Sequence, residues 1–268
     1  MNRPAVAPLA LLILALASPA AAKEPETIHF EAKYEQDKPF KRTRTFSLKS
    51  TETVAGTTKV ITMKDSSILR VTMLQAGNNW SPARLKLVFE EHKYEESGVE
   101  PPRAYSLKGL EAEVRAEARA KDESRFYWTE EPKDPLAKDA AQTILFLENW
   151  LSADDDRVVG VPFLLFSGAL PPMARILAGF PFNVDIKVAR VVEEEGRRIA
   201  ELSVDDSKEG TVDTSAGPMK STIRVKRRFH YDLTKGRILS WVDHVEVDHD
   251  LEGYTGRHVV DLENTFTY

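Results

Sequence analysis

Residues 110–119 read LEAEVRAEAR, a run in which apolar and charged side chains alternate. The composition favours a helix, because Ala, Leu, Glu and Arg all have high helix propensity. The spacing favours a strand, because alternation with a period of two puts every apolar side chain on one face, whereas a helix would spread the alanines around its circumference. We therefore predict a strand here, returning through a turn at 121–124 into a second strand at Phe126 and Trp128.

The same alternation recurs along most of the chain. In the last third it runs through five successive stretches, of which the first four are separated by turn-forming segments at 194–196, 210–218 and 234–236. Sheets with one buried and one solvated face show this pattern, so we expect one long antiparallel meander. The residues predicted to face inward include Leu85, Leu87, Phe89, Val184, Ile186, Leu202, Val204, Ile223, Val225, Phe229, Tyr231, Leu239, Trp241, Val245, Val247, Val260, Leu262, Phe266 and Tyr268.

A helical stretch separates the two strand-rich parts. Asp134 can cap a helix that starts at Pro135, and Pro171-Pro172 opens a second, shorter helix that Gly179 ends. We predict an α+β fold, mainly antiparallel β, with a curved sheet or partial barrel and a central helical insert at about 134–180 packed on it. The residues predicted to form the inner face of the first helix are Leu136, Ala140, Ile144, Leu147 and Leu151.

The first 22 residues have the features of a signal peptide. Arg3 precedes an apolar run over 7–17, and Ser18-Pro19-Ala20-Ala21-Ala22 supplies small residues for cleavage. The run is shorter than the ~20 residues that a spanning helix needs, which disfavours an uncleaved anchor. We expect cleavage near Ala22 and a periplasmic or secreted protein. The remainder, 23–268, is predicted to be a single domain, with a possible pseudo-repeat of 24–133 and 181–268.

Composition excludes several classes of chemistry. The chain has no cysteine, which rules out disulfides, thiolate metal sites and a cysteine nucleophile. Its 37 Lys and Arg against 42 Asp and Glu give a net charge of −5, which provides no general attraction for nucleic acid. The HExxH, GxSxG and GxxxxGK[ST] motifs are absent from the sequence. We therefore predict no catalytic residues, no cofactor and no nucleic-acid partner.

One candidate metal site remains in the pattern of charged residues. His244, Glu246, Asp248 and Asp250 share one face of a predicted strand, where carboxylates and an imidazole can bind a cation. The solvent face of a strand explains the same alternation, and we favour that interpretation, so we predict no metal. Asp243 and His249 fall instead on the apolar face, as does Arg227, and buried charged or polar groups there must be paired.

Two basic clusters suggest a surface that binds anions. Residues 41–44 read KRTR, and the second cluster is Arg224 with Lys226-Arg227-Arg228, whose first charges alternate with Ile223 and Val225. A lipid headgroup or polyanionic glycan fits either cluster. Alternation places Arg224, Lys226 and Arg228 on a solvated strand face, which explains most of these charges without a partner.

An apolar passage at 158–180 supplies the candidate ligand site. Its large side chains either plug the sheet as ordinary core or line a pocket between the sheet and the helix at 134–151, where a lipid-like ligand can sit. The predicted ligand-binding residues are Phe163, Leu165, Phe166, Leu170 and Ile176.

The chain as a whole resembles exported bacterial β-rich proteins classed as families of unknown function. The resemblance lies in the leader, the meander, Leu170-Pro171-Pro172, and a closing 229–233 stretch, FHYDL, followed by Gly236-Arg237-Ile238 and Ser240. More distantly, the chain is similar to periplasmic lipoprotein carriers, which implies a curved sheet closed by helices over an apolar cavity. No carrier signature residue maps onto this sequence.

The sequence predicts an exported, non-enzymatic binding protein of the cell envelope that holds a hydrophobic or amphipathic ligand between sheet and helices. The expected partner is a lipid-like molecule or an envelope protein. A structural or protein-interaction module using an exposed sheet edge is the first alternative. An enzyme without a recognisable motif is the second. A closing strand ending in Tyr268 is also typical of outer-membrane barrels, but the charged outward faces argue against an integral membrane protein.

Overall fold

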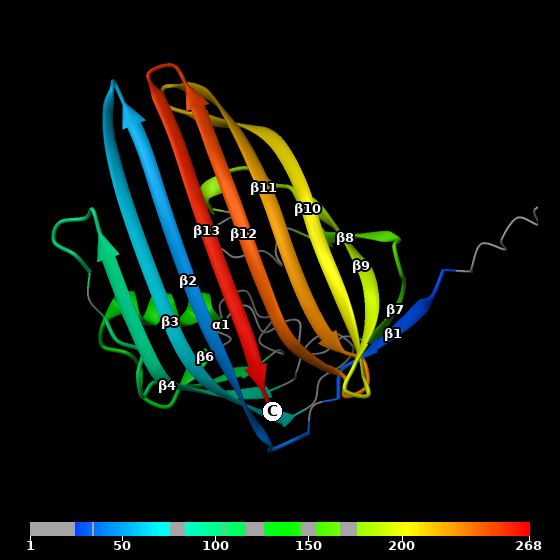
Figure 1. Ribbon diagram of the computed structural model, residues 1–268. Helices are drawn as coiled ribbons and strands as arrows, with labels where there is room; N and C mark the ends of the chain where they lie inside the picture. Colours follow the sequence, from blue (N-terminus) through cyan, green and yellow to red (C-terminus); the bar gives the residue numbers. More distant parts are fainter. Residues whose placement is uncertain are drawn as a thin grey trace, which may run out of the picture.

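The protein is built almost entirely from antiparallel strands. The computed structural model describes residues 25–33, 35–75, 84–103, 105–115, 126–145, 154–166 and 176–268. Figure 1 shows long strands lying side by side in one curved sheet, with a single labelled helix, α1 (Pro135–Leu145). The strands are β1 (Thr27–Glu31), β2 (Pro39–Val54), β3 (Thr57–Gln75), β4 (Arg84–Ser97), β5 (Glu111–Arg115), β6 (Phe126–Trp128), β7 (Asp154–Val158), β8 (Pro162–Phe166), β9 (Asn183–Glu194), β10 (Arg197–Thr214), β11 (Gly217–Asp232), β12 (Arg237–Leu251) and β13 (Tyr254–Thr267).

Eleven of these strands form one sheet in the order β6-β5-β4-β3-β2-β13-β12-β11-β10-β9-β8. Every neighbouring pair is antiparallel, which confirms the predicted antiparallel meander. In the described part of the chain the outer strands β6 and β8 do not pair with each other, so the sheet is curved but not closed. β1 and β7 form a separate two-stranded ribbon at one end (Figure 1).

The last strand of the chain pairs with β2 in the middle of the sheet. β13 pairs with β2 along its whole length, from Tyr254 opposite Val54 to Thr267 opposite Lys41. The two halves that the sequence suggested therefore form the two wings of one sheet, joined by this central ladder. Their proposed pseudo-repeat and the single-domain boundary stay predictions.

The ambiguous stretch at 110–119 forms a strand where the structure describes it. Residues 111–115 form β5, which pairs with β4 on one side and with β6 on the other. Ala112 is buried and lies opposite Leu87, so alternation rather than helix propensity decides the conformation. Residues 116–119 lie outside the described residues.

The central helical insert at 134–180 was predicted too broadly. α1 covers only part of it, because 154–158 form β7 and 162–166 form β8. Short apolar runs fit a strand as well as a buried helix, and pairing decides between them: β8 extends the free edge of β9, and β7 pairs with β1. Of the second predicted helix, the described part is one turn at 176–178. Among the described helices, none is long and apolar enough to cross a membrane.

α1 begins as predicted but faces the sheet differently. Asp134 Oδ1 accepts a hydrogen bond from the backbone N–H of Leu136 at 2.9 Å, as an N-cap does. The predicted inner face was wrong at its first residue, since Leu136 is 42% exposed while Ala137 and Ala141 are buried. Small alanines allow the helix backbone to approach its neighbours closely. Leu147 and Leu151 lie outside the described residues, and the side chain of Ile144 is not described.

Removing the cap tests this helix start. Asp134→Ala is expected to lower the free energy of unfolding by about 1 kcal/mol, because the N–H of Leu136 loses its acceptor. Urea denaturation measures the difference. Asp134→Asn, which keeps a capping oxygen, is the matched control and should change little; equal losses in the two variants would contradict the capping role.

Candidate functional site on the inner face of the sheet

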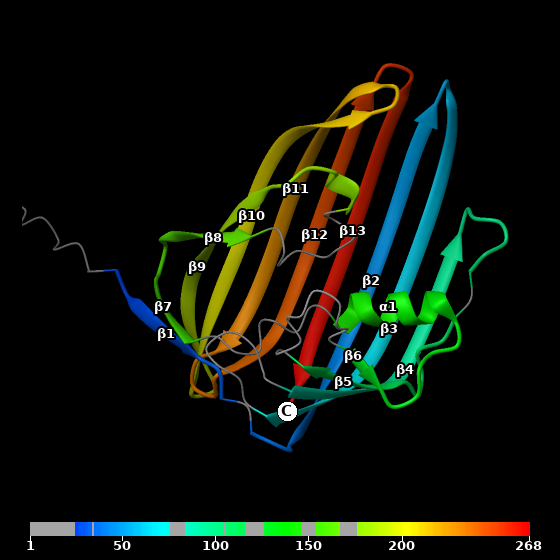
Figure 2. The same ribbon diagram turned by 180° about the vertical axis from the view of Figure 1, so that it is seen from behind.

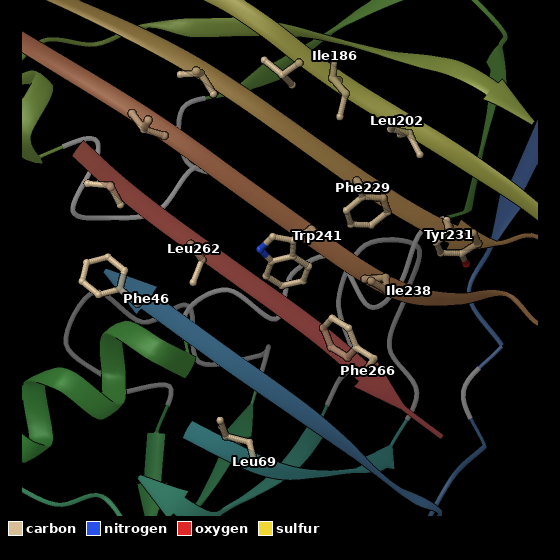
Figure 3. Packing of buried hydrophobic residues seen from close by; sticks show 14 of the residues in the cluster. Phe46, Leu69, Ile186, Leu202, Phe229, Tyr231, Ile238, Trp241, Leu262 and Phe266 are labelled. Atoms are coloured by element: carbon tan, nitrogen blue, oxygen red, sulfur yellow. The ribbon is translucent and has the colours of Figure 1, made fainter. Parts of the chain in front are cut away.

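The inner face of the sheet is apolar over much of its length. We use this name for the side that carries the buried residues of Figure 3, among them Leu69, Trp241 and Leu262. In Figure 2, α1 and the β1–β7 ribbon lie on the near side of the long strands, and Ala137, Ala141, Ile28 and Phe30 from these elements belong to the same buried cluster. The inner face is therefore the interior of the molecule.

A row of aromatic rings crosses this face near the end of β13. Trp241 lies between Phe229 of β11 and Phe266 of β13, with ring centroids 6.3 and 5.4 Å away. Phe40 of β2 continues the row at 6.2 Å from Phe266. Each such side chain contributes roughly 1.5–3 kcal/mol of burial free energy, so the row firmly joins the four central strands, and Figure 3 shows three of its rings.

Two of the polar residues that the sequence placed on the apolar face pair with each other. Arg227 of β11 lies directly opposite Asp243 of β12. The guanidinium donates from Nη2 to Oδ2 at 2.8 Å and from Nε to Oδ1, a bidentate arrangement. The side chains are only 5% and 0% exposed. The structure therefore confirms that Asp243 and Arg227 lie on the apolar face and that their charges are paired.

A second buried cluster centres on Asp65 of β3. Arg44 Nη1 donates to Asp65 Oδ1 at 2.5 Å, and His92 Nε2 and Tyr105 Oη lie 3.2 and 3.4 Å from Oδ2. The backbone N–H of Leu107 donates to His92 Nδ1 at 3.2 Å. Nδ1 therefore carries no proton, and Nε2–H is the donor to Asp65. One carboxylate thus ties β2, β3 and β4 to the segment at 105–107.

The electrostatics of this cluster favour an ionised carboxylate. Burial alone would raise the pKa of Asp65, but the hydrogen bond from His92 and the charge of Arg44 outweigh it and hold the pKa below the usual 3.8. Burial and the same carboxylate raise the pKa of Tyr105. The Asp65 cluster therefore stabilises the packing of these strands. Both ring nitrogens of His92 are engaged in hydrogen bonds within it, so His92 has no lone pair with which to accept a proton from a substrate.

The basic cluster at 41–44 is not a surface patch. Alternation turns Arg42 and Arg44 inward, with 0% and 5% exposure, while Lys41 stays outside. Arg42 Nε donates to Asn264 Oδ1 at 2.8 Å, and its guanidinium lies 5.3 Å from the Trp241 ring. Burial, with a contribution from Arg44, lowers the pKa of Arg42 to about 9. The hypothesis of an anionic partner for this cluster was therefore wrong in its geometry.

The proposed cation ligands lie on the outer face, where each of the first three already has a partner. His244 Nδ1 is 2.7 Å from Asp261 Oδ1, a contact that raises the pKa of His244. Arg257 donates to Glu246 at 3.1 Å, Arg224 pairs with Asp248, and Asp250 is exposed. The described residues contain no group of three or more ligands placed to hold a metal. The solvent-face interpretation accounts for this stretch.

The predicted ligand residues lie at and after the β8 edge. The β8–β9 register pairs Phe163 with Ile186 and Leu165 with Val184, and both partners are buried on the inner face. The side chains of Phe163, Leu165 and Phe166, and the whole of Leu170, fall outside the described residues. Ile176 is described and is 71% exposed. Their role as a ligand site stays a prediction.

A depression of about 410 Å³ lies on the opposite side of the sheet. It runs across β4, β3, β2 and β13, and most of its lining consists of outward polar side chains, several already in ion pairs such as Lys93 with Glu95. We regard it as a furrow between rows of solvated side chains rather than as the ligand site. Its outward polar lining is Thr45, Ser47, Lys64, Ser66, Lys93, Glu95, Asp261 and Glu263.

Sequence reasoning missed the Asp65 cluster. A signal was present, since Arg42 and Arg44 have the same parity as Phe40, Phe46 and Leu48 on one strand. The contribution of the 105–107 segment carried no local signal, because Tyr105 reaches Asp65 from 40 residues away in the chain and Leu107 donates to His92.

The protein is an open, curved antiparallel sheet with a buried polar network on its inner face. Comparisons with known proteins do not assign it to a family. No family model matches the chain, and no curated protein matches it. Solved structures give weak likenesses. One, titled for lipid–protein interactions in lipovitellin, has a TM-score of 0.48 at 10% identity over 88% of this chain. The chain spans only 26% of that protein.

Two further structures are similar over most of their length but at lower scores. DynF from the dynemicin biosynthesis pathway of Micromonospora chersina has a TM-score of 0.20 at 8% identity, covering 99% of this chain and 92% of that one. A DUF1329 family protein from Desulfovibrio piger has a TM-score of 0.15 at 11% identity, covering 85% of each. The resemblance to exported β-rich families and lipoprotein carriers stays an expectation.

Proposed function

We propose that the protein is an exported, non-enzymatic binding protein of the cell envelope that holds a hydrophobic or amphipathic ligand against the inner face of its sheet. The observation that carries the proposal is the combination of an apolar inner face with a sheet whose outer strands, in the described residues, are not paired to each other. A closed barrel fixes its interior through a continuous ladder. An open sheet can change the distance between its edges to admit a ligand.

The polar groups on the inner face fit this role better than catalysis. Asp65 and Asp243, the buried carboxylates of the two arginine pairs, each accept charged hydrogen bonds from an arginine, and Asp65 accepts two more donors. A general base needs a free lone pair facing the reacting atom. The signal peptide that the sequence predicts at 1–22 supports export. The interaction module remains the alternative, but the described edges β6 and β8 have only three and five residues, and short edges disfavour strand addition.

Ligand binding can be tested on the exported protein purified without detergent. Native mass spectrometry should show a bound apolar molecule, and the fluorescent probe N-phenyl-1-naphthylamine should bind saturably. Ile176→Asp is expected to weaken probe binding by about tenfold, since removing one apolar contact of roughly 1.5 kcal/mol has that effect.

Val242→Asp is the matched control, because Val242 is also an exposed apolar residue (44%) but belongs to the outer face. Its probe affinity should equal that of the unmodified protein. Ligand-free mass spectra together with no saturable probe binding would overturn the proposal. Equal effects of the two variants would show that Ile176 is not in the site.

A further inference from the structure

Two histidines lie together on the inner face, toward the hairpin end of β12 and β13. His249 and His258 are 7% and 3% exposed, and their ring centroids are 5.2 Å apart in an edge-to-face arrangement. The register places His249 opposite Gly256, where an added Cβ would come within 3.2 Å of His258 Nε2. Nδ1 of each ring is buried and has no hydrogen-bond partner. Buried polar atoms usually have a hydrogen-bond partner, so the two unpartnered Nδ1 atoms are not explained by packing alone.

Residues 176–180, which we call the latch segment, lie on these strands beside the histidines. Ser221, opposite His249 in the β11–β12 ladder, donates from Oγ to the backbone oxygen of Ala178 at 3.0 Å. The backbone of Leu177 lies close enough to His249 to raise the pKa of its ring. The Phe180 ring occupies the space above Gly210, where a Cβ would lie only 2.6 Å from it. The latch segment therefore depends on polar contacts that include one of the two histidines.

We propose that His249 and His258 form a proton-operated latch: as neutral imidazoles they keep the latch segment on the inner face, and protonation in mildly acidic solution releases it. A single charge is costly in this buried site, and two charges on rings 5.2 Å apart also repel each other. Release exposes both rings to water and removes that cost. The proposal concerns the chain alone and needs no ligand.

The surrounding groups support this direction of change. Burial lowers the pKa of both rings, and the neighbouring His249 lowers that of His258 further. Glu52 of β2 and Asp248 of β12 oppose the shift in both, as does the Leu177 backbone for His249, but they do not cancel it. Tyr254 of β13 is a neutral phenol, whose own pKa burial raises.

The sign of the pH dependence follows from these directions. In the released state the rings are solvated and titrate near 6.5, so between the two pKa values the released state binds more protons than the latched state. The contribution of the pair to the latched state is complete above pH 6.5. It is lost progressively as the pH falls below that value toward the lowered pKa values.

The absence of cysteine from the chain allows a clean test with single thiols. Ala178→Cys places a thiol at a fully buried position of the latch segment, and Ile176→Cys places one at an exposed position two residues earlier. The measured quantity is the ratio of their maleimide labelling rates, which cancels the pH dependence of the reagent. The ratio should rise severalfold between pH 7.5 and 5.5, because the released state binds more protons than the latched state as the pH falls.

Three controls decide the outcome. Ala200→Cys, buried in β10, reports general opening, and an equal rise there would overturn the latch. His249→Gln combined with His258→Gln should abolish the pH dependence, whereas His244→Gln on the outer face should keep it. Should the double variant not fold, the ring titrations of the unmodified protein by NMR decide: values at or above 6.5 for both rings contradict the proposal. Failure of the latch leaves ligand binding at neutral pH untouched.

Discussion

Arg227→Met is expected to lower the free energy of unfolding by about 3–5 kcal/mol, the usual cost of leaving one partner of a buried ion pair uncompensated. Asp243 is fully buried and receives both of its charged hydrogen bonds from this guanidinium. Met fills much of the same volume, so the loss reflects charge and hydrogen bonding rather than a cavity. Urea denaturation at pH 7 measures the change.

Arg224→Met is the matched control, three positions earlier on the same strand. Arg224 pairs with Asp248 on the outer face and is 48% exposed, so its loss should cost no more than about 1 kcal/mol. The double variant Arg227→Met with Asp243→Leu should recover most of the lost stability, because the buried charge disappears with its partner. A loss at Arg227 no larger than that at Arg224 would show that the pair is not buried in solution.

Alternation predicted which side of the long strands faces inward. It failed at Tyr268, which is 41% exposed just after β13, and where the strand pairing is irregular. On β13 the inward Val260, Leu262 and Phe266 are buried as expected. At the start of β12 the prediction was wrong: Ile238 is fully buried and Leu239 is only partly buried. The register shifts at this point of the β11–β12 ladder, and one extra residue reverses the two faces. The extra residue has no signature in a single sequence.

The order of strands across the sheet could not be predicted in the same way. The β2–β13 ladder joins residues at least 200 positions apart, and nothing local in either strand specifies its partner. The Asp65 cluster was predictable in part, unlike the strand order. The two-residue turn at Ala55-Gly56 fixes the β2–β3 register, which sets Asp65 opposite Phe46 and next to Arg44. Reading that turn correctly would have predicted the pair, but not the approach of Tyr105.

Asp65→Asn is expected to lower the free energy of unfolding by about 3–5 kcal/mol at pH 7, because the Arg44 charge stays buried without its counter-charge. The amide also lacks the second acceptor oxygen that His92 and Tyr105 use in the native cluster. Amide hydrogen exchange at 105–107 should quicken, because Tyr105 bonds this carboxylate directly and Leu107 bonds His92, whose other ring nitrogen bonds it.

The same variant should also change the acid sensitivity of the protein. The folded-state pKa of Asp65 lies below 3.8, so its stabilising contribution is complete above that value and is lost as the pH falls through the folded pKa. The stability difference between the two proteins should therefore shrink as the pH falls from 7 to 3.

Two further variants serve as controls. Asp261→Asn removes an exposed carboxylate beside His244 and should cost at most about 1 kcal/mol. Tyr105→Phe removes one long hydrogen bond of the cluster and should also cost about 1 kcal/mol. Losses of similar size in all three variants would mean that the Arg44–Asp65 pair does not dominate the cluster.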